Sequence, residues 1–194
     1  MANAPRLGII AAMARAAFDK RSFNAVAMCV PGEAERAIRS LAPWATFRAT
    51  PYRSVLLGEI EGDAARAVVE AWGADRSTFA HLVRLIPLER VTTFEGEDVT
   101  ERLCCELESS GARLVGRTFH VRARLRGLTG KLESHAVERA LGGFLLDVAV
   151  KSGGPAKVSF KDPDVVLAIE VIGRRVGYGF LDRATRALPL VRPR

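Results

Sequence analysis

Short apolar runs alternate with amphipathic segments along residues 23–90. The apolar runs have the length of strands and are bounded by turn residues such as Pro31-Gly32 and Gly62-Asp63. The amphipathic segments place apolar residues at helical spacing, and the first of them ends before Pro43. The expected strands are 25–30, 53–60 and 82–88, and the expected helices are 31–41 and 65–72. This alternation predicts a small α/β sandwich with a ferredoxin-like arrangement.

The pattern changes after residue 91, and the clearest strand of the chain lies in this part. Along 117–126 every second residue is apolar, and the residues between them are polar or basic. A nearly continuous apolar run at 165–172 has the pattern of a central strand. The expected order is a helix near 97–107, strand 117–126, helix 134–148, then strands 157–160, 165–172 and 175–181.

These patterns divide the chain into four parts. We expect a loosely ordered segment at 1–22, a ferredoxin-like domain at 23–90, a second domain at 91–184 and a basic tail at 185–194. The longest apolar run, 7–14, is far shorter than the ~20 residues of a membrane-spanning helix. A membrane protein is therefore not expected.

Composition and motifs narrow the function classes. With 48% apolar and 26% charged residues, the 194-residue chain has the balance of a globular protein. Its three cysteines, Cys29, Cys104 and Cys105, have no metal-binding spacing and indicate a reducing, cytoplasmic location. Neither a P-loop nor a dinucleotide-binding motif occurs, and the histidines are scattered. We therefore expect no cofactor, no metal site and no catalytic residue.

The basic excess is concentrated in one region. The chain has a net charge of +7, with 24 Arg and only 5 Lys. The net charge is +3 over 1–90, −5 over 91–112 and +9 over 113–194. A GC-rich genome also produces many arginines, and an ordinary solvated surface is the alternative interpretation. The segregation nevertheless favours a cationic face for a polyanion.

Strand 117–126 carries the sharpest part of this charge. Alternation places Arg122, Arg124 and Arg126 on one face, about 6.6 Å apart along the strand. Like charges in a row oppose folding unless carboxylates of a neighbouring element or a bound anion neutralise them. We favour a row of phosphate contacts, extended by Lys157, Lys161, Arg174 and Arg175.

A short loop after this strand has the form of a nucleotide-clamping motif. Gly127-Leu-Thr-Gly130-Lys131 matches the G-x-x-G loop of KH domains, but it follows a strand instead of joining two helices. We interpret it as a flexible turn in which Lys131 is a candidate phosphate contact.

Four separated segments of the second half resemble a THUMP domain. They are Phe119-His-Val-Arg-Ala-Arg-Leu-Arg126, Ser134 with Glu138-Arg139-Ala-Leu-Gly142, Lys157-Val-Ser-Phe-Lys-Asp-Pro-Asp164 and Val166-Leu-Ala-Ile-Glu-Val-Ile172. Their order agrees with the helix–strand–helix–strand–strand–strand succession of that family. The region before them resembles the ferredoxin-like domain that usually accompanies it.

The resemblance implies an α+β RNA-binding protein that recognises tRNA, commonly at its acceptor end. About a dozen residues follow the last expected strand, which is too few for a catalytic domain. The chain is therefore similar to the stand-alone THUMP adaptors of a separate tRNA cytidine N4-acetyltransferase, and its expected role is tRNA modification by acetylation. By this resemblance the candidate RNA contacts are Arg122, Arg124, Arg126, Lys131, Arg139, Lys157, Lys161, Arg174 and Arg175.

Two alternatives stay open. The chain is the RNA-binding subunit of a split tRNA methyltransferase or thiolation enzyme, or it is a ferredoxin-like interaction module without RNA. Its oligomeric state does not follow from the sequence.

Overall fold

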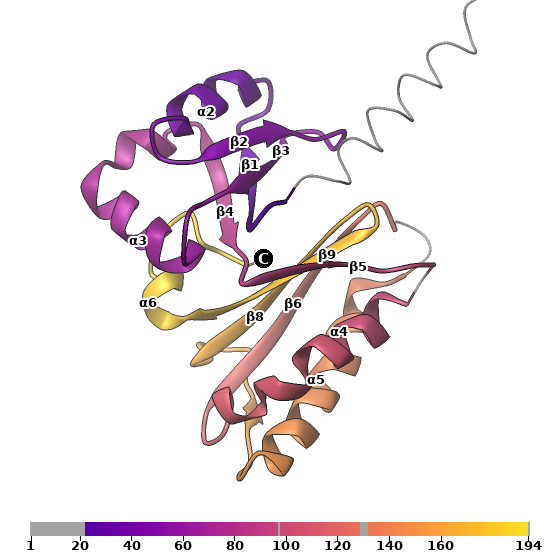
Figure 1. The fold of residues 1–194 in the computed structure, drawn as a ribbon. Helices are drawn as coiled ribbons and strands as arrows, with labels where there is room; N and C mark the ends of the chain where they lie inside the picture. Colours follow the sequence, from indigo (N-terminus) through magenta and orange to yellow (C-terminus); the bar gives the residue numbers. More distant parts are fainter. Residues whose placement is uncertain (1–21, 97, 129–131, 194) are drawn as a thin grey trace, which may run out of the picture.

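The computed structural model describes residues 22–96, 98–128 and 132–193, which form two β-sheets with helices (Figure 1). The expected loose segment at 1–22 therefore lies outside the described residues, except for Ser22. None of the helices in the described part of the chain is long and apolar enough to cross a membrane.

The first half has the β-α-β-β-α-β order of a ferredoxin-like domain. Its elements are β1 (Ala25–Cys29), α2 (Ala34–Leu41), β2 (Thr46–Ala49), β3 (Val55–Glu59), α3 (Ala64–Ala74), the 3₁₀ turn η1 (Arg76–Phe79) and β4 (Leu82–Pro87). The sheet order is β2-β3-β1-β4, and each neighbouring pair of strands is antiparallel. Strand β2 is absent from the sequence prediction because it is a four-residue edge strand with one buried residue.

The second half is a five-stranded sheet in the order β5-β9-β8-β6-β7. Its elements are β5 (Arg90–Thr93), α4 (Val99–Leu107), the 3₁₀ turn η2 (Glu108–Arg113), β6 (Thr118–Arg126), α5 (Ser134–Lys151), β7 (Lys157–Val158), β8 (Val165–Ile172), β9 (Arg175–Asp182) and α6 (Arg183–Arg186). Strand β6 runs parallel to β7 and β8, whereas β9 is antiparallel to β5 and β8. The short edge strand β5 is the element that the sequence pattern misses here.

One face of the second sheet is covered by α4 and α5, and the opposite face lies toward the first half (Figure 1). Phe119, Val121 and Ala123 of β6 pack in a core with Leu141 and Leu145 of α5. The hydrophobic core of the first half extends into the second sheet through Ala168, Ile172 and Leu181. The two halves are therefore joined by a continuous packed interface.

The chain crosses between the sheets at residues 87–89, close to β9. The amide of Glu89 donates to the Tyr178 carbonyl over 2.8 Å. A Cβ atom at Gly179 would lie 2.6 Å from the Pro87 carbonyl oxygen, so glycine permits this close approach.

The described residues of the expected basic tail at 185–194, which are 185–193, do not form a free tail. Leu190 and Val191 are buried in the core of the first half. The amide of Leu85, on the edge strand β4, donates to the Leu190 carbonyl over 3.0 Å. The burial of Leu190 and Val191 and the hydrogen bond from Leu85 hold this segment against the first half. The arginines dominate the composition of the segment, so the sequence pattern does not indicate this packing.

Candidate nucleic-acid interface

The alternation along β6 places its arginines on the shared face that the sequence predicts. In the register with β8, Arg122 lies beside Ala168, Arg124 beside Glu170 and Arg126 beside Ile172. This face is directed toward the first half of the chain, because Ala168 and Ile172 belong to the core of that half. The row of arginines is therefore covered at one end.

Arg126 belongs to a buried ion-pair cluster between the two halves. Its guanidinium pairs with Glu170 of β8, and Glu170 also pairs with Arg84 of β4. Glu170 is only 2% exposed, so both arginines are drawn inward to neutralise a charge removed from water. Burial lowers the pKa of Arg84, and the nearby charges of Arg124 and Arg126 lower it further, while Glu170 opposes both effects.

The sequence prediction of an open phosphate row is therefore wrong in geometry for Arg126 and Arg175. Arg175 is buried, and its guanidinium lies over the ring of Phe23 at 4.4 Å from the centroid. Arg124 is half-buried in the same face. These side chains take part in the contact between the two halves. For Arg126 the other possibility given by the sequence holds, because a carboxylate of a neighbouring strand neutralises its charge.

The other end of the β6 face is open, and there Arg122 remains accessible. Its side chain is 38% exposed and lies 4.0 Å from Glu138 of α5, a long ion pair that contributes little at such exposure. Phe160, in the loop after β7, is 79% exposed beside it and packs edge-on against His120 at a centroid distance of 4.8 Å. An exposed aromatic ring beside an accessible arginine is the arrangement on which unpaired bases stack.

Phe160 and His120 line two hollows. A groove of about 380 Å³ lies on one side and includes Arg122, Arg186 and Arg192. The side chain of Arg186 is committed to the fold, since it donates to the carbonyls of Pro163 and Leu181. Arg192 is exposed and forms no ion pair with a described residue. This groove is therefore basic and reaches the solvent.

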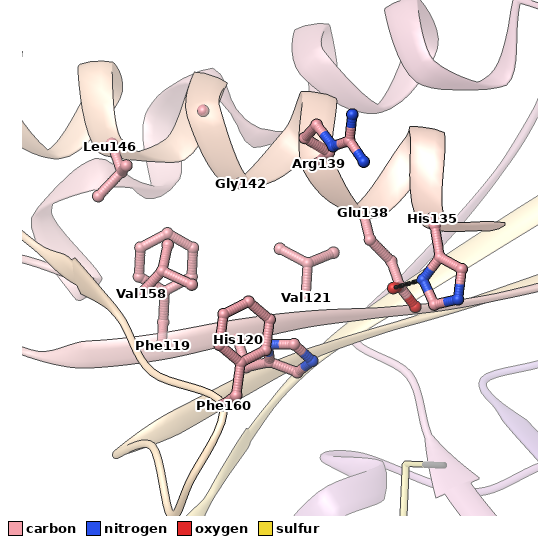
Figure 2. Close-up of a pocket in the computed structure, with 11 residues that line it drawn as sticks. Phe119, His120, Val121, His135, Glu138, Arg139, Gly142, Leu146, Val158 and Phe160 are labelled. Carbon is pink, nitrogen blue, oxygen red and sulfur yellow. Dashed lines mark hydrogen bonds and ion pairs between the residues drawn. The ribbon is translucent and has the colours of Figure 1, made fainter.

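The second hollow is a cavity of about 320 Å³ between β6 and α5 (Figure 2). Leu146 of α5 lies above Val158 and Phe119 at one end of the cavity, Val121 of β6 lies further along the strand, and Arg139 and Glu138 follow on the helix. Glu138 accepts from the amide of Ala123 over 2.9 Å and contacts His135 at 3.1 Å. The helix thus covers the β6 edge where the two-residue strand β7 has ended.

The remaining predicted contacts are distributed over the surface. Arg139 is exposed at the cavity, and Lys157 and Lys161 are exposed at the same end of the sheet as Phe160. Arg174 is exposed in the turn between β8 and β9, which lies about 20 Å along the strands from the end of the sheet that carries Phe160. Lys131 lies outside the described residues. The structure therefore groups Arg122, Arg139, Lys157 and Lys161, and separates them from Arg174.

The surroundings of His120 favour the neutral form of its imidazole. Burial lowers the pKa of His120 below its usual value of 6.5, and the positive charge of Arg122 lowers it further, whereas Glu138 acts in the opposite direction. The imidazole therefore offers one N–H donor and one acceptor nitrogen.

Sequence reasoning missed three features of this site: Phe160, His120 and Arg192. Phe160 follows the end of β7, where a large apolar residue has no strand partner to cover it. His120 belongs to no metal-ligand spacing, so the sequence pattern does not distinguish it from His81 and His135. The sequence contains one signal that points to this site, the adjacent pair Gly142-Gly143 in the middle of a helical pattern, where glycine is unfavourable.

No family model matches the chain. Over 65 residues, 34% of its length, the chain is 46% identical to a tRNA sulfurtransferase of Vibrio atlanticus (strain LGP32), and the match covers 12% of that protein. Part of this chain is therefore related to a protein of tRNA modification.

Solved structures share its fold over most of its length. TrmN from Thermus thermophilus is similar with a TM-score of 0.57 and 17% identity, over 87% of this chain and 48% of that one. A possible methylase from Clostridium difficile 630 has a TM-score of 0.56 and 10% identity, over 81% and 40%. A 4-thiouridine synthetase in complex with RNA and ATP has a TM-score of 0.50 and 16% identity, over 82% and 41%.

The structure confirms the α+β fold class expected from the sequence, a ferredoxin-like region followed by a helix–strand–helix–strand–strand–strand succession, and the solved structures share this fold. In each comparison the chain spans less than half the length of the protein that it resembles.

Proposed function

We propose that this chain is a non-catalytic tRNA-binding protein that presents tRNA, by its acceptor end, to a separate modification enzyme in the cytoplasm. A tRNA cytidine N4-acetyltransferase is the favoured enzyme. The observation that carries the proposal is the exposed ring of Phe160, which stands between a basic groove and a cavity beside the accessible Arg122.

The charge distribution supports an RNA ligand. Residues 113–194, which form this site, hold a net charge of +9. Arginine and lysine side chains neutralise phosphates, and aromatic rings stack on bases irrespective of sequence. A relative named as a tRNA sulfurtransferase and a solved neighbour in complex with RNA are consistent with this ligand.

The cysteines support a role without catalysis. Burial, and then the neighbouring Cys105 and Glu101, raise the pKa of the Cys104 thiol, which reduces the thiolate fraction available for attack. Cys29 is buried against the carbonyl of Ser54. Among the described residues, no group of three or more His, Cys, Asp or Glu side chains is placed to hold a metal ion.

A mobility-shift assay with tRNA across a salt series tests RNA binding. Phosphate contacts release counterions, so we expect the logarithm of the affinity to fall linearly with the logarithm of the salt concentration. An acceptor-stem minihelix should compete with tRNA, and an anticodon-stem hairpin should compete less. Absence of binding at low salt contradicts the proposal.

The comparisons also favour a second candidate, an RNA-binding subunit of a split tRNA sulfurtransferase or methyltransferase. The observation behind it is the relative named as a sulfurtransferase and the similarity to a possible methylase. Affinity purification of the tagged chain, followed by mass spectrometry of the captured proteins, distinguishes the partners. Loss of N4-acetylcytidine in tRNA after gene deletion supports the first candidate, and loss of 4-thiouridine or a methylated nucleoside supports the second.

A further inference from the structure

The cavity between β6 and α5 has features that binding to phosphates alone does not explain. Beyond Phe119 no strand of the described residues lies beside this edge of β6, because β7 pairs with Thr118 and Phe119 only. Helix α5 passes along this edge and leaves the hollow of about 320 Å³ (Figure 2). Cavities that bind small molecules begin at about 300 Å³, so this one accommodates a single small group.

Two adjacent glycines of α5 keep one wall of the cavity open. Gly142 and Gly143 lie in the middle of an 18-residue helix, where each glycine costs about 1 kcal/mol relative to alanine. A Cβ atom at either position would meet no heavy atom of a described residue within 4 Å. Close helix packing therefore does not require them, and their absent side chains leave the space beside the helix unfilled.

His120 presents unused hydrogen-bonding atoms at the same place. The residue is 6% exposed, and both of its ring nitrogens are buried without a partner among the described residues. An unsatisfied buried polar group costs roughly 1–3 kcal/mol, which a ligand that bonds to the imidazole would recover. His120 lines the cavity, and its ring contacts the edge of the Phe160 ring.

The lining defines the chemistry of the occupant. Leu146, Val121, Val158 and the ring of Phe160 offer apolar surfaces, whereas His120 offers a donor and an acceptor. A flat heteroaromatic group with polar edges satisfies both kinds of wall. Arg139 lines the cavity and Arg122 lines the adjoining groove, so both are placed for the phosphates of the same strand.

We propose that this cavity holds one unstacked nucleobase of the bound RNA, between Phe160 and the Gly142-Gly143 face of α5, with His120 bonding to its edge. The proposal rests on the RNA binding proposed above. It differs from that function in one respect, since it assigns a base-dependent part of the affinity to a defined cavity.

The test compares a short fluorescent oligouridylate with an abasic strand of the same length and phosphate number. We expect the wild-type protein to bind the base-bearing strand at least about fivefold more tightly, in line with stacking of one base. In the double variant G142A/G143A we expect this ratio to fall to about one, with the affinity for the abasic strand unchanged. Because alanine favours the helix, the melting temperature of the variant should rise.

Three further variants exclude a general effect of helix stabilisation and a loss of folding. Gly73→Ala is a control, because Gly73 is, like Gly143, an exposed helical glycine, and no heavy atom of a described residue lies within 4 Å of its missing Cβ, but it lies in α3, away from the cavity lining. It should stabilise the protein without changing the ratio of affinities. Phe160→Ala should lower the ratio and Phe160→Trp should restore it, and the exposure of Phe160 makes unfolding by these changes unexpected.

The outcomes are distinguishable. If neither strand binds, the proposed RNA function fails. If both strands bind the wild-type protein equally, or if the double variant keeps the base-dependent ratio, the base cavity is wrong and RNA binding stands. If the double variant changes only the capture of a partner protein, the occupant is a protein side chain and the proposal is overturned.

Discussion

Glu170 pairs with Arg84 across the contact between the two sheets, although the two residues lie 86 positions apart in the chain. The carboxylate is on β8, and the guanidinium is on the edge strand β4 of the other sheet. Arg126 supplies the second positive charge to the same carboxylate. This relationship makes the arginine row of β6 partly structural, and it separates variants that affect folding from variants that affect binding.

Glu170→Gln should unfold more easily by about 3–5 kcal/mol, because it leaves Arg84 and Arg126 buried without a counter-charge. Urea denaturation followed by circular dichroism measures the change. Glu70→Gln is the matched control, since Glu70 pairs with Arg66 on the exposed surface of α3, and it should cost at most about 1 kcal/mol. Equal losses of unfolding free energy in the two variants would show that the buried ion pairs stabilise the fold no more than an exposed pair does.

Arg122→Ala should weaken tRNA binding and reduce the slope of the salt dependence by about one, with little change in melting temperature. Arg126→Ala should lower the melting temperature and leave tRNA affinity and its salt dependence nearly unchanged, because the Arg126 side chain pairs with Glu170. Arg66→Ala, at an exposed arginine of α3 that does not line the groove, serves as the control for nonspecific charge. An unchanged affinity in Arg122→Ala would contradict the assigned interface.

Stability should fall as the pH drops from about 7 to about 5.5. The folded protein lowers the pKa of His120, so the unfolded chain binds more protons below about pH 6.5, and protonation favours unfolding. His120→Phe should flatten this dependence in urea titrations at the two pH values. His135→Gln, at an exposed residue that shares Glu138 with the same site, should retain it. Parallel curves for wild type and His120→Phe would refute the assignment.

Leu190→Ala should destabilise the protein by about 2–5 kcal/mol, the usual loss for a buried leucine. The expected cause is the loss of packing against the first half of the chain. Val150→Ala, at an exposed position of α5, should change the free energy of unfolding by less than about 0.5 kcal/mol. A small effect of Leu190→Ala would mean that residues 185–193 contribute little to the fold.

The sequence predicts the strongly periodic helices and strands well, and it does not predict the short edge strands. The alternation at 117–126 and the helical pattern from 134 reappear as β6 and α5. The four-residue edge strands β2 and β5 have few buried residues, so their sequences show no clear period. Periodicity fixes which residues share a face, but it does not reveal what covers that face.

This limit explains the mixed outcome at the site. Arg122 and Arg126 share a face as predicted, and tertiary contacts alone decide that Arg126 is buried while Arg122 is accessible. The lone acidic residue Glu170 in an otherwise apolar strand was the signal for a buried ion pair. The cavity was not predictable, because it depends on where α5 lies relative to the end of β7.

The contact of Leu190 with β4 has a consequence for how the protein is made. The edge of the first sheet is complete only when residues about 100 positions later have left the ribosome. At typical rates of synthesis this interval lasts roughly 5–20 s, during which β4 exposes unpaired backbone groups and Arg84 has no counter-ion. The nascent first half is thus a natural substrate for a holding chaperone, and slow translation of the second half would favour aggregation through this edge.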